Sequence, residues 1–305
     1  MLFNTPILFL TFNRPDLTKI VFEKIKDIKP SRLYWATDGP RGDHPDDAEK
    51  VKKVHEIAKK IGWPCELMTL FRDTNLGCKL ACSGAISWFF ENENMGIILE
   101  DDCLPSQSFF MFCEELLIRY QDNSLVNAIG GRNALESFYQ GSNSYFFSKY
   151  NRVWGWATWK RAWAGLDMNM SDWKNFKNTE QYKSWFSGNN EKTFFEDKWK
   201  QCISEKIDTW DFQWYYHRLK NGGLTAVPTV NLIANIGLGH QDATHTLGTG
   251  RSFLQSQAQE IPFPLIHPDS ISIDRRMDEK LFQIRSKLGL KSKTLSFLKQ
   301  LIFTK

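Results

Sequence analysis

Apolar and polar residues alternate between two patterns through the first part of the chain. Short apolar runs, typical of buried strands, occupy residues 6–12, 32–37, 65–71, 95–100 and 125–131. Between these runs, apolar residues recur every three or four positions, which predicts amphipathic helices over residues 17–28, 46–61, 78–91 and 106–121. Strands that alternate with helices in this way build right-handed βαβ units. We therefore expect a doubly wound α/β fold with a mostly parallel sheet flanked by helices.

The alternation is lost in the second part of the chain. Residues 137–206 are rich in aromatic and polar side chains, and we expect loops and helices there. A helix over residues 211–220 ends at Asn-Gly-Gly, and residues 224–237 supply one or two more strands. Residues 240–251 are rich in glycine and threonine without a helical or strand period, which predicts a flexible loop.

The end of the chain carries an amphipathic pattern of its own. Leu295, Leu298, Leu301 and Ile302 lie on one side of a predicted helix whose other positions include lysines. This helix either packs on the domain or contacts an anionic membrane surface as a weak anchor. We therefore expect one domain over residues 1–240, followed by a flexible loop and C-terminal helical extension over residues 241–305.

Composition narrows the class of protein. The 305 residues are 42% hydrophobic and 24% charged, enough to bury a sizeable core, and the net charge of +4 is too small and too evenly spread for nucleic-acid binding. No apolar run reaches the ~18 residues of a membrane span, and no leader pattern opens the chain, so we expect a cytoplasmic protein. If the last helix is an anchor, the protein lies at the inner face of the membrane. The six cysteines lack C-x-x-C spacing, which favours free thiols over disulfides or zinc.

Three consecutive acids, Glu100, Asp101 and Asp102, directly follow the apolar residues 95–99. Their mutual repulsion is costly unless they lie in water or face a cation. One interpretation is a solvated turn that ends the strand. The other is a site for Mn²⁺ or Mg²⁺, because carboxylates are preferred ligands of these ions and open α/β sheets bind ligands at the carboxyl ends of their strands.

Three segments together carry a family resemblance: "NLGCKLACSGAI" at residues 75–86, "LEDDCLPSQSFF" at residues 99–110 and "WDFQWYYHRLKNGGLTAVP" at residues 210–228. In this order they resemble nucleotide-sugar glycosyltransferases of the A-type (GT-A-like) fold, over residues 3–240. The first and third segments are similar to family 2 members, and the acidic motif is similar to the N-acetylglucosaminyltransferase I family. The resemblance implies a metal-dependent, inverting transfer of a hexosyl or N-acetylhexosaminyl group from a nucleotide sugar, with UDP as the nucleotide, to a glycan or lipid-linked acceptor in polysaccharide biosynthesis.

The resemblance also implies roles for individual residues. Residues 1–135 become the nucleotide-binding half and residues 136–240 the acceptor-binding half. Asp102 is the expected ligand of Mn²⁺ or Mg²⁺, and Asp211 is the expected base that deprotonates the acceptor hydroxyl, although an acid at a helix N-terminus is the alternative for Asp211. The expected contacts to the nucleotide and donor sugar are Thr11, Arg14, Asp38, Lys79, Glu100, Asp101 and Gly155, with Asp38 on the base, Lys79 at the diphosphate, Asp101 on the ribose or sugar, and Glu100 bracing the loop.

Aromatic residues around Gly155 suggest contact with a sugar. Trp154 and Trp156 flank this glycine, and indole faces stack on the CH surfaces of sugars. Trp159 and Trp163 follow at helical spacing, and we expect them in the core. His240 is either a late metal or phosphate ligand or a plain loop histidine.

Two other functions fit the same pattern. The first is a nucleotidyltransferase that makes nucleotide sugars, but "TFNRPD" at residues 11–16 lacks the glycine-rich, basic loop expected after the first strand of such enzymes. The second is a non-catalytic protein that binds a nucleotide or sugar. The chain also departs from the family 2 pattern, since it has EDD in place of aspartate-x-aspartate and Trp210 in place of the acid before Asp211.

Overall fold

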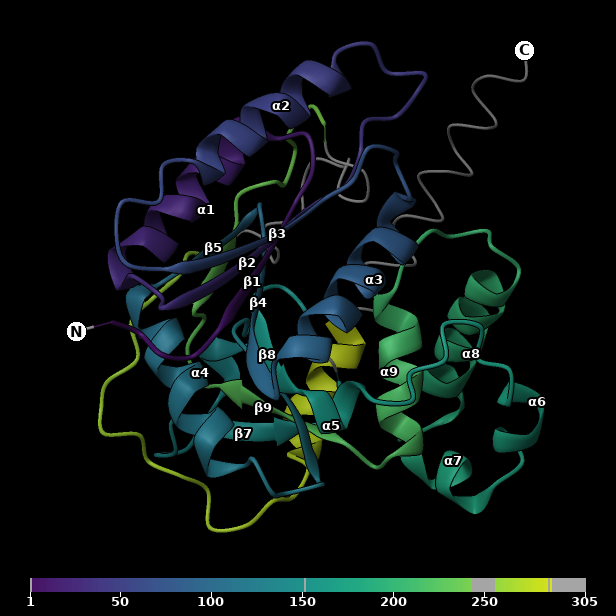
Figure 1. Cartoon of the computed structure of the whole chain (residues 1–305). Helices are drawn as coiled ribbons and strands as arrows, with labels where there is room; N and C mark the ends of the chain where they lie inside the picture. Colours follow the sequence, from purple (N-terminus) through teal and green to yellow (C-terminus); the bar gives the residue numbers. More distant parts are fainter. Residues whose placement is uncertain (1, 151, 243–255, 285, 287–305) are drawn as a thin grey trace, which may run out of the picture.

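The structure, a computed structural model, describes residues 2–150, 152–242, 256–284 and 286 (Figure 1). Most of the loop predicted at residues 240–251 and the helix predicted at residues 295–302 lie outside the described residues. Contact with a membrane through that helix, and the domain boundary at residue 240, therefore stay predictions. Among the described residues, no helix is long and apolar enough to cross a membrane.

An eight-stranded sheet forms the centre of the molecule, in the order β3-β2-β1-β4-β8-β6-β9-β7. Its strands are β1 (Ile7–Thr11), β2 (Arg32–Thr37), β3 (Glu66–Phe71), β4 (Met95–Glu100), β6 (Val126–Gly130), β7 (Tyr145–Ser148), β8 (Trp156–Trp159) and β9 (Leu224–Pro228). The pairs β1 with β2, β1 with β4, β2 with β3 and β6 with β9 are parallel. This confirms the doubly wound, mostly parallel α/β fold.

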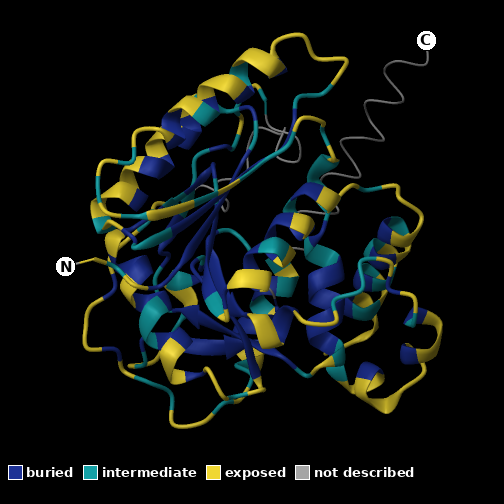
Figure 2. Ribbon diagram, viewed as in Figure 1, coloured by how far each residue is buried: buried dark blue, intermediate teal, exposed yellow. Residues whose placement is uncertain are grey.

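Helices cover both faces of the sheet. They are α1 (Pro15–Ile28), α2 (Asp47–Ala58), α3 (Gly77–Asn92), α4 (Gln107–Arg119), α5 (Lys160–Trp163), α6 (Trp173–Phe176), α7 (Glu180–Trp185), α8 (Asn189–Ile203) and α9 (Asp211–Lys220), with a 3₁₀ turn at Glu136–Phe138. Figure 2 shows the buried strands between helices whose outer faces are exposed. Helices therefore shield the faces of the sheet, and a site is expected at the ends of its strands.

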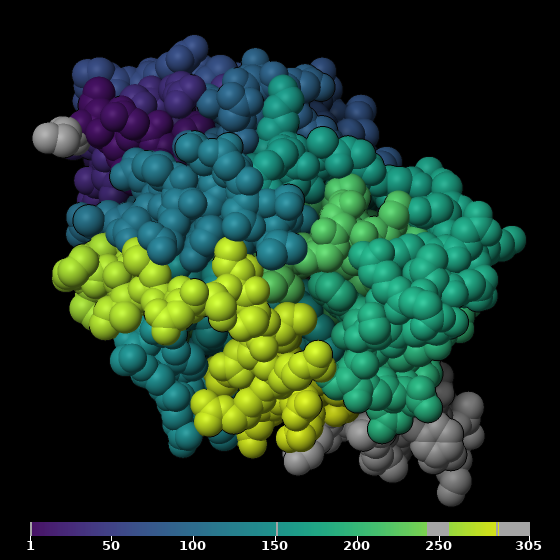
Figure 3. All heavy atoms as spheres, turned by 90° about the horizontal axis from the view of Figure 1, so that it is seen from below, coloured from purple at the N-terminus to yellow at the C-terminus, as the bar shows by residue number. Residues whose placement is uncertain are grey.

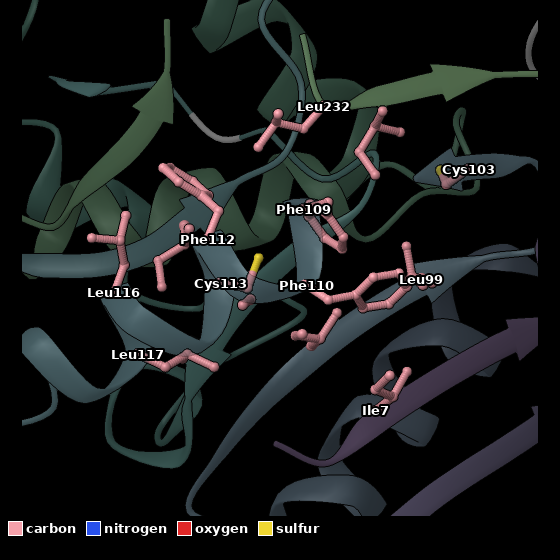
Figure 4. Close-up of a cluster of buried hydrophobic side chains, with 14 of the residues drawn as sticks. Ile7, Leu99, Cys103, Phe109, Phe110, Phe112, Cys113, Leu116, Leu117 and Leu232 are labelled. Atoms are coloured by element: carbon pink, nitrogen blue, oxygen red, sulfur yellow. The ribbon is translucent and has the colours of Figure 1, made fainter. Parts of the chain in front are cut away.

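Successive residues of β1 enter different cores, as expected for side chains that alternate across a sheet. Ile7 and Phe9 pack with α1, α2 and α4, whereas Leu8 and Leu10 pack with α3, α5 and α9. Figure 4 shows part of the first core, in which Phe109, Phe110 and Cys113 of α4 belong to the same buried cluster as Ile7 and Leu99. Burial on both faces explains why these strands are continuous apolar runs in the sequence.

The central strand β8 was not predicted. It pairs antiparallel with both β4 and β6, at the place where the sequence suggested a helical spacing of tryptophans. Trp156 lies in the core with α3 and α9, and Trp159 lies in the core with α4, so the two rings are on opposite faces of the sheet. Trp159 and Trp163 are buried, as expected, but on a strand and on the short helix α5.

Two further parts surround the sheet. Helices α6 to α9 enclose an aromatic core of their own, beside the sheet in Figure 1. Strand β5 (Cys103–Pro105) pairs antiparallel with β10 (Ile233–Asn235). Residues 256–284 cross the outer surface (Figure 3), where the Glu260 carboxylate accepts hydrogen bonds from the first amides of α4. All six cysteines are free thiols, as predicted.

Candidate functional site

A cavity of about 310 Å³ lies where β1, β2 and β4 end. Strand β1 lies between β2 and β4, and the chain builds the sheet outward from β1 in both directions, so the cavity occupies the topological switch point of the sheet. Its polar lining comes from Thr11, Asn13, Arg14, Asp38, Arg41, Arg72, Asn75, Cys78, Cys82, Glu100, Asp101, Asp102, Asp208, Asn235 and Asp242. We refer to this cavity as the switch-point pocket.

Arg14 is the cation that faces the acidic motif. It directly precedes α1, and its guanidinium bonds to the carboxylate of Asp101 and, through Nη1, to Oδ2 of Asp102 at 3.0 Å. Burial lowers the pKa of Arg14, but the charges of Asp101 and Asp102 outweigh it and raise that pKa overall. Asp101 and Asp102 therefore form neither a solvated turn nor a preformed set of metal ligands, because the guanidinium group of Arg14 compensates their negative charge.

Glu100 lines the same pocket from the last position of β4. Burial, followed by the negative charge of Asp102, raises the pKa of its carboxyl group. Burial also raises the pKa of Asp101, although Arg14 opposes it. The Glu100 carboxyl group therefore stays protonated to a higher pH than the carboxyl group of a surface glutamate.

Asp38 organises the loop between β3 and α3. Its carboxylate accepts hydrogen bonds from the backbone amides of Gly39, Leu76 and Gly77 and from the side chain of Asn75. Burial raises the pKa of Asp38, and these amides act against that shift. The resemblance assigned Asp38 to the nucleotide base. In the structure it lines the pocket, but its oxygens already hold the wall of the pocket in place.

Arg41 and Arg72 were missed by the sequence analysis. Arg41 follows β2 and bonds to Asp47 with its Nε at 2.7 Å, and it lies over the ring of Phe12. Arg72 follows β3 directly. The argument that placed the acids at the carboxyl end of β4 applies equally to both arginines, because each comes directly after a predicted parallel strand or its turn. That signal was present in the sequence.

Asp208, rather than Asp211, reaches the pocket from the loop before α9. The Asp208 carboxylate accepts hydrogen bonds from the amides of Cys78 at 2.7 Å and Lys79 at 2.9 Å, at the N-terminus of α3. Asp211 is the first residue of α9, its Oδ1 accepts a hydrogen bond from the Thr209 hydroxyl, and it does not line the pocket. Asp211 thus lies at the N-terminus of α9, and its role as catalytic base stays a prediction.

The glycine and tryptophans expected to contact the donor sugar separate in the structure. Trp154 lines the pocket. Trp156 is only 1% exposed and its ring lies 5.6 Å from that of Trp210, so it belongs to the core and does not reach a ligand. A Cβ at Gly155 would meet Ile233 at 2.4 Å, and its φ is +61°. This glycine makes room for Ile233, and its contact with a donor sugar stays a prediction.

Two other predicted ligands also lie away from the pocket lining. The Lys79 amide bonds to Asp208, but its side chain is not part of the lining. His240 is 3.1 Å from Asp16, measured from Nε2 to Oδ2, and it is likewise absent from the lining. Three residues before His240, a Cβ at Gly237 would lie 2.7 Å from the side chain of Asp102.

The acids of the pocket could hold a metal ion only together with ligands supplied by a substrate. No group of three His, Cys, Asp or Glu side chains among the described residues is positioned to hold an ion. Asp102 lines the pocket and has one oxygen bonded to Arg14 and the other to the Cys103 thiol. Magnesium commonly binds through one or two carboxylates together with the phosphates of a substrate. Asp102 suits that kind of site, in which the substrate completes the coordination.

Comparisons with known proteins show weak likenesses only. No family model matches the chain, and no curated protein matches it. HddC from Yersinia pseudotuberculosis matches at TM-score 0.32 and 9% identity, covering 52% of this chain and 77% of HddC. The 4-diphosphocytidyl-2C-methyl-D-erythritol synthase from Anaerococcus prevotii matches at TM-score 0.32 and 9% identity, covering 64% and 84%. The inositol-1-phosphate CTP transferase from T. maritima matches at TM-score 0.31 and 9% identity, covering 74% and 85%.

The predicted glycosyltransferase activity is corrected by these findings. None of the three structures bears the name of a glycosyltransferase, and one is named as a CTP transferase. At such low TM-scores no residue role is taken from the matched structures. The alternative prediction of a nucleotidyltransferase therefore replaces the prediction of a glycosyltransferase.

Proposed function

We propose that this chain is a nucleotidyltransferase, which joins the nucleotidyl group of a nucleoside triphosphate to a sugar phosphate or a similar phosphorylated alcohol. The observation that carries the proposal is the meeting of Arg14, Arg41 and Arg72 with Asp101 and Asp102 in the switch-point pocket. Guanidinium groups bind phosphate oxygens in a forked geometry, and several of them suit a polyphosphate.

The charge of the pocket supports a divalent cation as part of the substrate. Six carboxylates and three guanidinium groups line the pocket. A bare triphosphate would be repelled by this excess of negative charge, whereas its complex with Mg²⁺ or Mn²⁺ would carry a smaller charge. Asp102 is the residue that would hold the ion together with the phosphates. The ion would neutralise charge that develops on the departing pyrophosphate.

The reaction follows from this arrangement. A phosphate oxygen of the second substrate attacks the α-phosphorus, the bond from that phosphorus to the bridging oxygen of the β-phosphate breaks, and pyrophosphate leaves. An attacking phosphate is already ionised, so no general base is required, in agreement with a pocket lining that does not include Asp211. Arg14, Arg41 and Arg72 orient the phosphates, which is the main protein contribution in phosphoryl transfer.

The turn after β1 does not contradict this proposal. "TFNRPD" supplies a single cation, Arg14, where a glycine-rich basic loop was expected. The other two cations of the pocket are Arg41, after β2, and Arg72, after β3. The positive charge that one loop would provide is thus distributed over three strand ends.

Pyrophosphate release tests the proposal. The purified protein is incubated with each of ATP, GTP, CTP, UTP and dTTP, with Mg²⁺ and a panel of sugar 1-phosphates, and pyrophosphate is measured. We expect release with one triphosphate and one sugar phosphate, and a loss of about 10² to 10³-fold in Arg72→Ala. Asp43→Asn is the control, because Asp43 is exposed and outside the pocket. Release from no combination, in a protein that binds the triphosphates, would refute nucleotidyl transfer.

A non-catalytic nucleotide-binding protein is the second candidate. It is favoured by the absence, among residues 2–150, 152–242, 256–284 and 286, of a closed set of metal ligands, and by the engagement of Asp38, Asp101 and Asp102 in internal bonds. Calorimetric titration separates the two candidates. Tight binding of one nucleotide with no turnover supports the binding protein, and turnover rejects it.

A further inference from the structure

Strand β3 forms one edge of the central sheet. Among the described residues it pairs only with β2, and Glu66, Leu67 and Thr69 are exposed there. Proteins usually protect such an edge with proline, lysine or a β-bulge, because its free backbone groups can pair with another chain. The β3 sequence "ELMTLF" contains neither proline nor lysine, and its register with β2 runs from Glu66 to Phe71 without a shift. The edge is therefore open to a further strand.

The free backbone groups of β3 belong to alternate residues. The amides of Glu66 and Arg72 donate to carbonyl oxygens at the two ends of β2, so both amides point toward β2. Successive residues of a strand direct their N–H and C=O groups to opposite sides. Leu67, Thr69 and Phe71 therefore present their backbone groups to the open edge.

These free groups are complementary to those of a second copy of the same strand. In an antiparallel pair centred on Thr69, this residue lies opposite Thr69 of the second copy, and Leu67 lies opposite Phe71. The residues that face each other in these pairs are the ones with free backbone groups. Each pair can thus exchange two N–H to C=O hydrogen bonds, as in an ordinary antiparallel ladder.

Charge selects this register among those that the backbone allows. Glu66 and Arg72 flank the centre of the strand at equal distances, and both lie on the same face because an even number of positions separates them. With Thr69 at the centre, Glu66 of each copy lies opposite Arg72 of the other, and opposite charges in such pairs are stabilising. With Leu67 at the centre, Glu66 would lie opposite Met68 and would gain no cation.

We infer that β3 is the interface through which two copies of this chain form a symmetric dimer, with the two β3 strands paired antiparallel around Thr69. A two-fold contact of this kind is closed, because no further copy can pair with either β3. Arg72 also lines the switch-point pocket, so the dimer would place Glu66 of each copy close to the pocket of the other. A guanidinium has five N–H donors, and a contact with this carboxylate leaves donors for a phosphate. The inference goes beyond the proposed nucleotidyl transfer and does not depend on it.

Sedimentation velocity over a range of protein concentrations tests the dimer. We expect wild-type protein to pass from monomer to dimer as the concentration rises, without larger species. Thr69→Pro removes one free N–H from each copy and keeps the donors that bind β2, so the dissociation constant should rise about 10-fold or more. Glu66→Lys brings like charges together at both ends of the pair, and the dissociation constant should rise about 3-fold or more.

Thr69→Ala is the matched control. It removes the same side chain as Thr69→Pro but keeps the backbone N–H, so the dissociation constant of the dimer should stay within about 3-fold of wild type. Thermal melts of all variants check that each is folded. If Thr69→Pro does not fold, Glu66→Lys and the cross-linking below decide the question.

Cysteine cross-linking tests the register. Opposed residues of a hydrogen-bonded antiparallel pair have Cα atoms about 5.5 Å apart, which is within reach of a disulfide. Thr69→Cys should therefore form a covalent dimer with oxidised glutathione, whereas Leu67→Cys should not, because Leu67 lies opposite Phe71 in this register. Wild-type protein, which keeps its own free thiols, gives the background.

Three results would overturn the dimer or its register. The first is wild-type protein that stays monomeric at every concentration. The second is an equal weakening of the dimer by Thr69→Pro and Thr69→Ala, and the third is cross-linking of Leu67→Cys as efficient as that of Thr69→Cys. A dimer without pyrophosphate release would reject nucleotidyl transfer and leave the interface intact. Pyrophosphate release by a protein that is always monomeric would do the reverse, so the two failures are distinguishable.

Discussion

The Nη1 atom of Arg14 lies 3.0 Å from Oδ2 of Asp102, although 88 residues separate the two in sequence. This contact joins the turn after β1 to the turn after β4, across the point where the strand order reverses. The repulsion expected among three consecutive acids is thereby reduced, because Arg14 compensates the charge of Asp101 and Asp102. It also means that any metal ion at Asp102 would share this carboxylate with a guanidinium.

Arg14→Gln should remove the competition between Arg14 and a metal ion for the Asp102 carboxylate. Removing one partner of a largely buried ion pair is expected to lower the free energy of unfolding by about 2 to 4 kcal/mol, because Asp101 and Asp102 lose their cation. Mn²⁺ should then restore more stability in the variant than it adds to the wild-type protein, measured by urea denaturation. Arg32→Gln, which breaks the 2.8 Å pair with Glu93 outside the pocket, should show no such rescue. Equal effects of Mn²⁺ on all three proteins would contradict the prediction.

Gly155→Ala and Gly165→Ala separate steric overlap from backbone strain. Both glycines have positive φ, +61° and +75°, so each alanine is expected to cost about 1 kcal/mol from the backbone alone. At Gly155 the new Cβ would also lie 2.4 Å from Ile233, whereas at Gly165 it would meet nothing within 4 Å. Gly155→Ala should therefore destabilise the protein by several kcal/mol more, with partial rescue by Ile233→Ala. Equal losses of stability in the two variants, measured by thermal denaturation, would show that the side chain of Ile233 moves aside without a cost and would contradict the prediction.

The N-terminal half of the fold could be predicted from the sequence because β1, β2, β4 and β6 are almost wholly buried and the helices between the strands bury one face. The apolar runs and the helical periods of residues 7–130 record that burial directly. Strand β8 could not be predicted, since Trp156 and Trp159 enter different cores, and those cores are formed by helices distant in sequence. Local spacing suggested a helix where tertiary packing makes a strand.

The site was predictable only where a residue follows a recognisable strand. This reasoning placed Asp38 and the acids of β4 correctly in the pocket, and it would have placed Arg41 and Arg72 there too. It failed for Asp208 and Trp156. Which acid of the 208–211 segment reaches α3, and which tryptophan faces the pocket, depends on the path of a loop and the packing of a core.

Trp154 and Trp156 should respond to substitution in opposite ways. Trp156→Ala removes a ring that is 1% exposed and packed on Trp210 and Trp214, so we expect a loss of about 3 to 5 kcal/mol in stability. Trp154→Ala should cost much less stability and should weaken ligand binding, because this ring lines the pocket. Chemical denaturation and calorimetric titration of both variants measure the two effects. Strong ligand dependence on Trp156 in a stable variant would contradict the structure.

Asp278 and Asp47 should give opposite dependences of stability on pH. Burial raises the pKa of Asp278 to about 6, against the hydrogen bonds from Ser148 and Lys149. Its ordinary pKa is about 3.9, so folded protein holds a proton that unfolded protein releases between these values. The contribution is complete below about pH 4 and is lost as the pH rises through about 6. Relative to Asp278→Asn, wild-type protein should lose up to about 3 kcal/mol between pH 4 and pH 7.

Asp47→Asn is the control for that experiment. Burial raises the pKa of Asp47, but hydrogen bonds from Arg41 and Asn13 outweigh it and lower the value to about 2. A lowered carboxyl pKa stabilises the protein above about pH 4, and this contribution is lost only as the pH falls through about 2. The stability difference between wild type and Asp47→Asn should thus stay nearly constant from pH 4 to pH 7. A parallel slope in both variants would show that Asp278 is not the titrating group.

Asp208→Asn and Asp211→Asn test which acid of this segment serves the pocket. The Asp208 carboxylate accepts hydrogen bonds from the backbone amides of Cys78 and Lys79 at the N-terminus of α3, and Gly77, which also lines the pocket, lies against it. An asparagine there keeps one acceptor oxygen and loses the charge that favours a helix N-terminus, so we expect a loss of about 1 kcal/mol in stability and weaker nucleotide binding. Asp211→Asn should leave nucleotide affinity and pyrophosphate release within about 2-fold of wild type, because the pocket lining does not include Asp211. A loss of about 100-fold or more in turnover for Asp211→Asn, with nucleotide binding intact, would instead require a conformational change that brings α9 to the pocket.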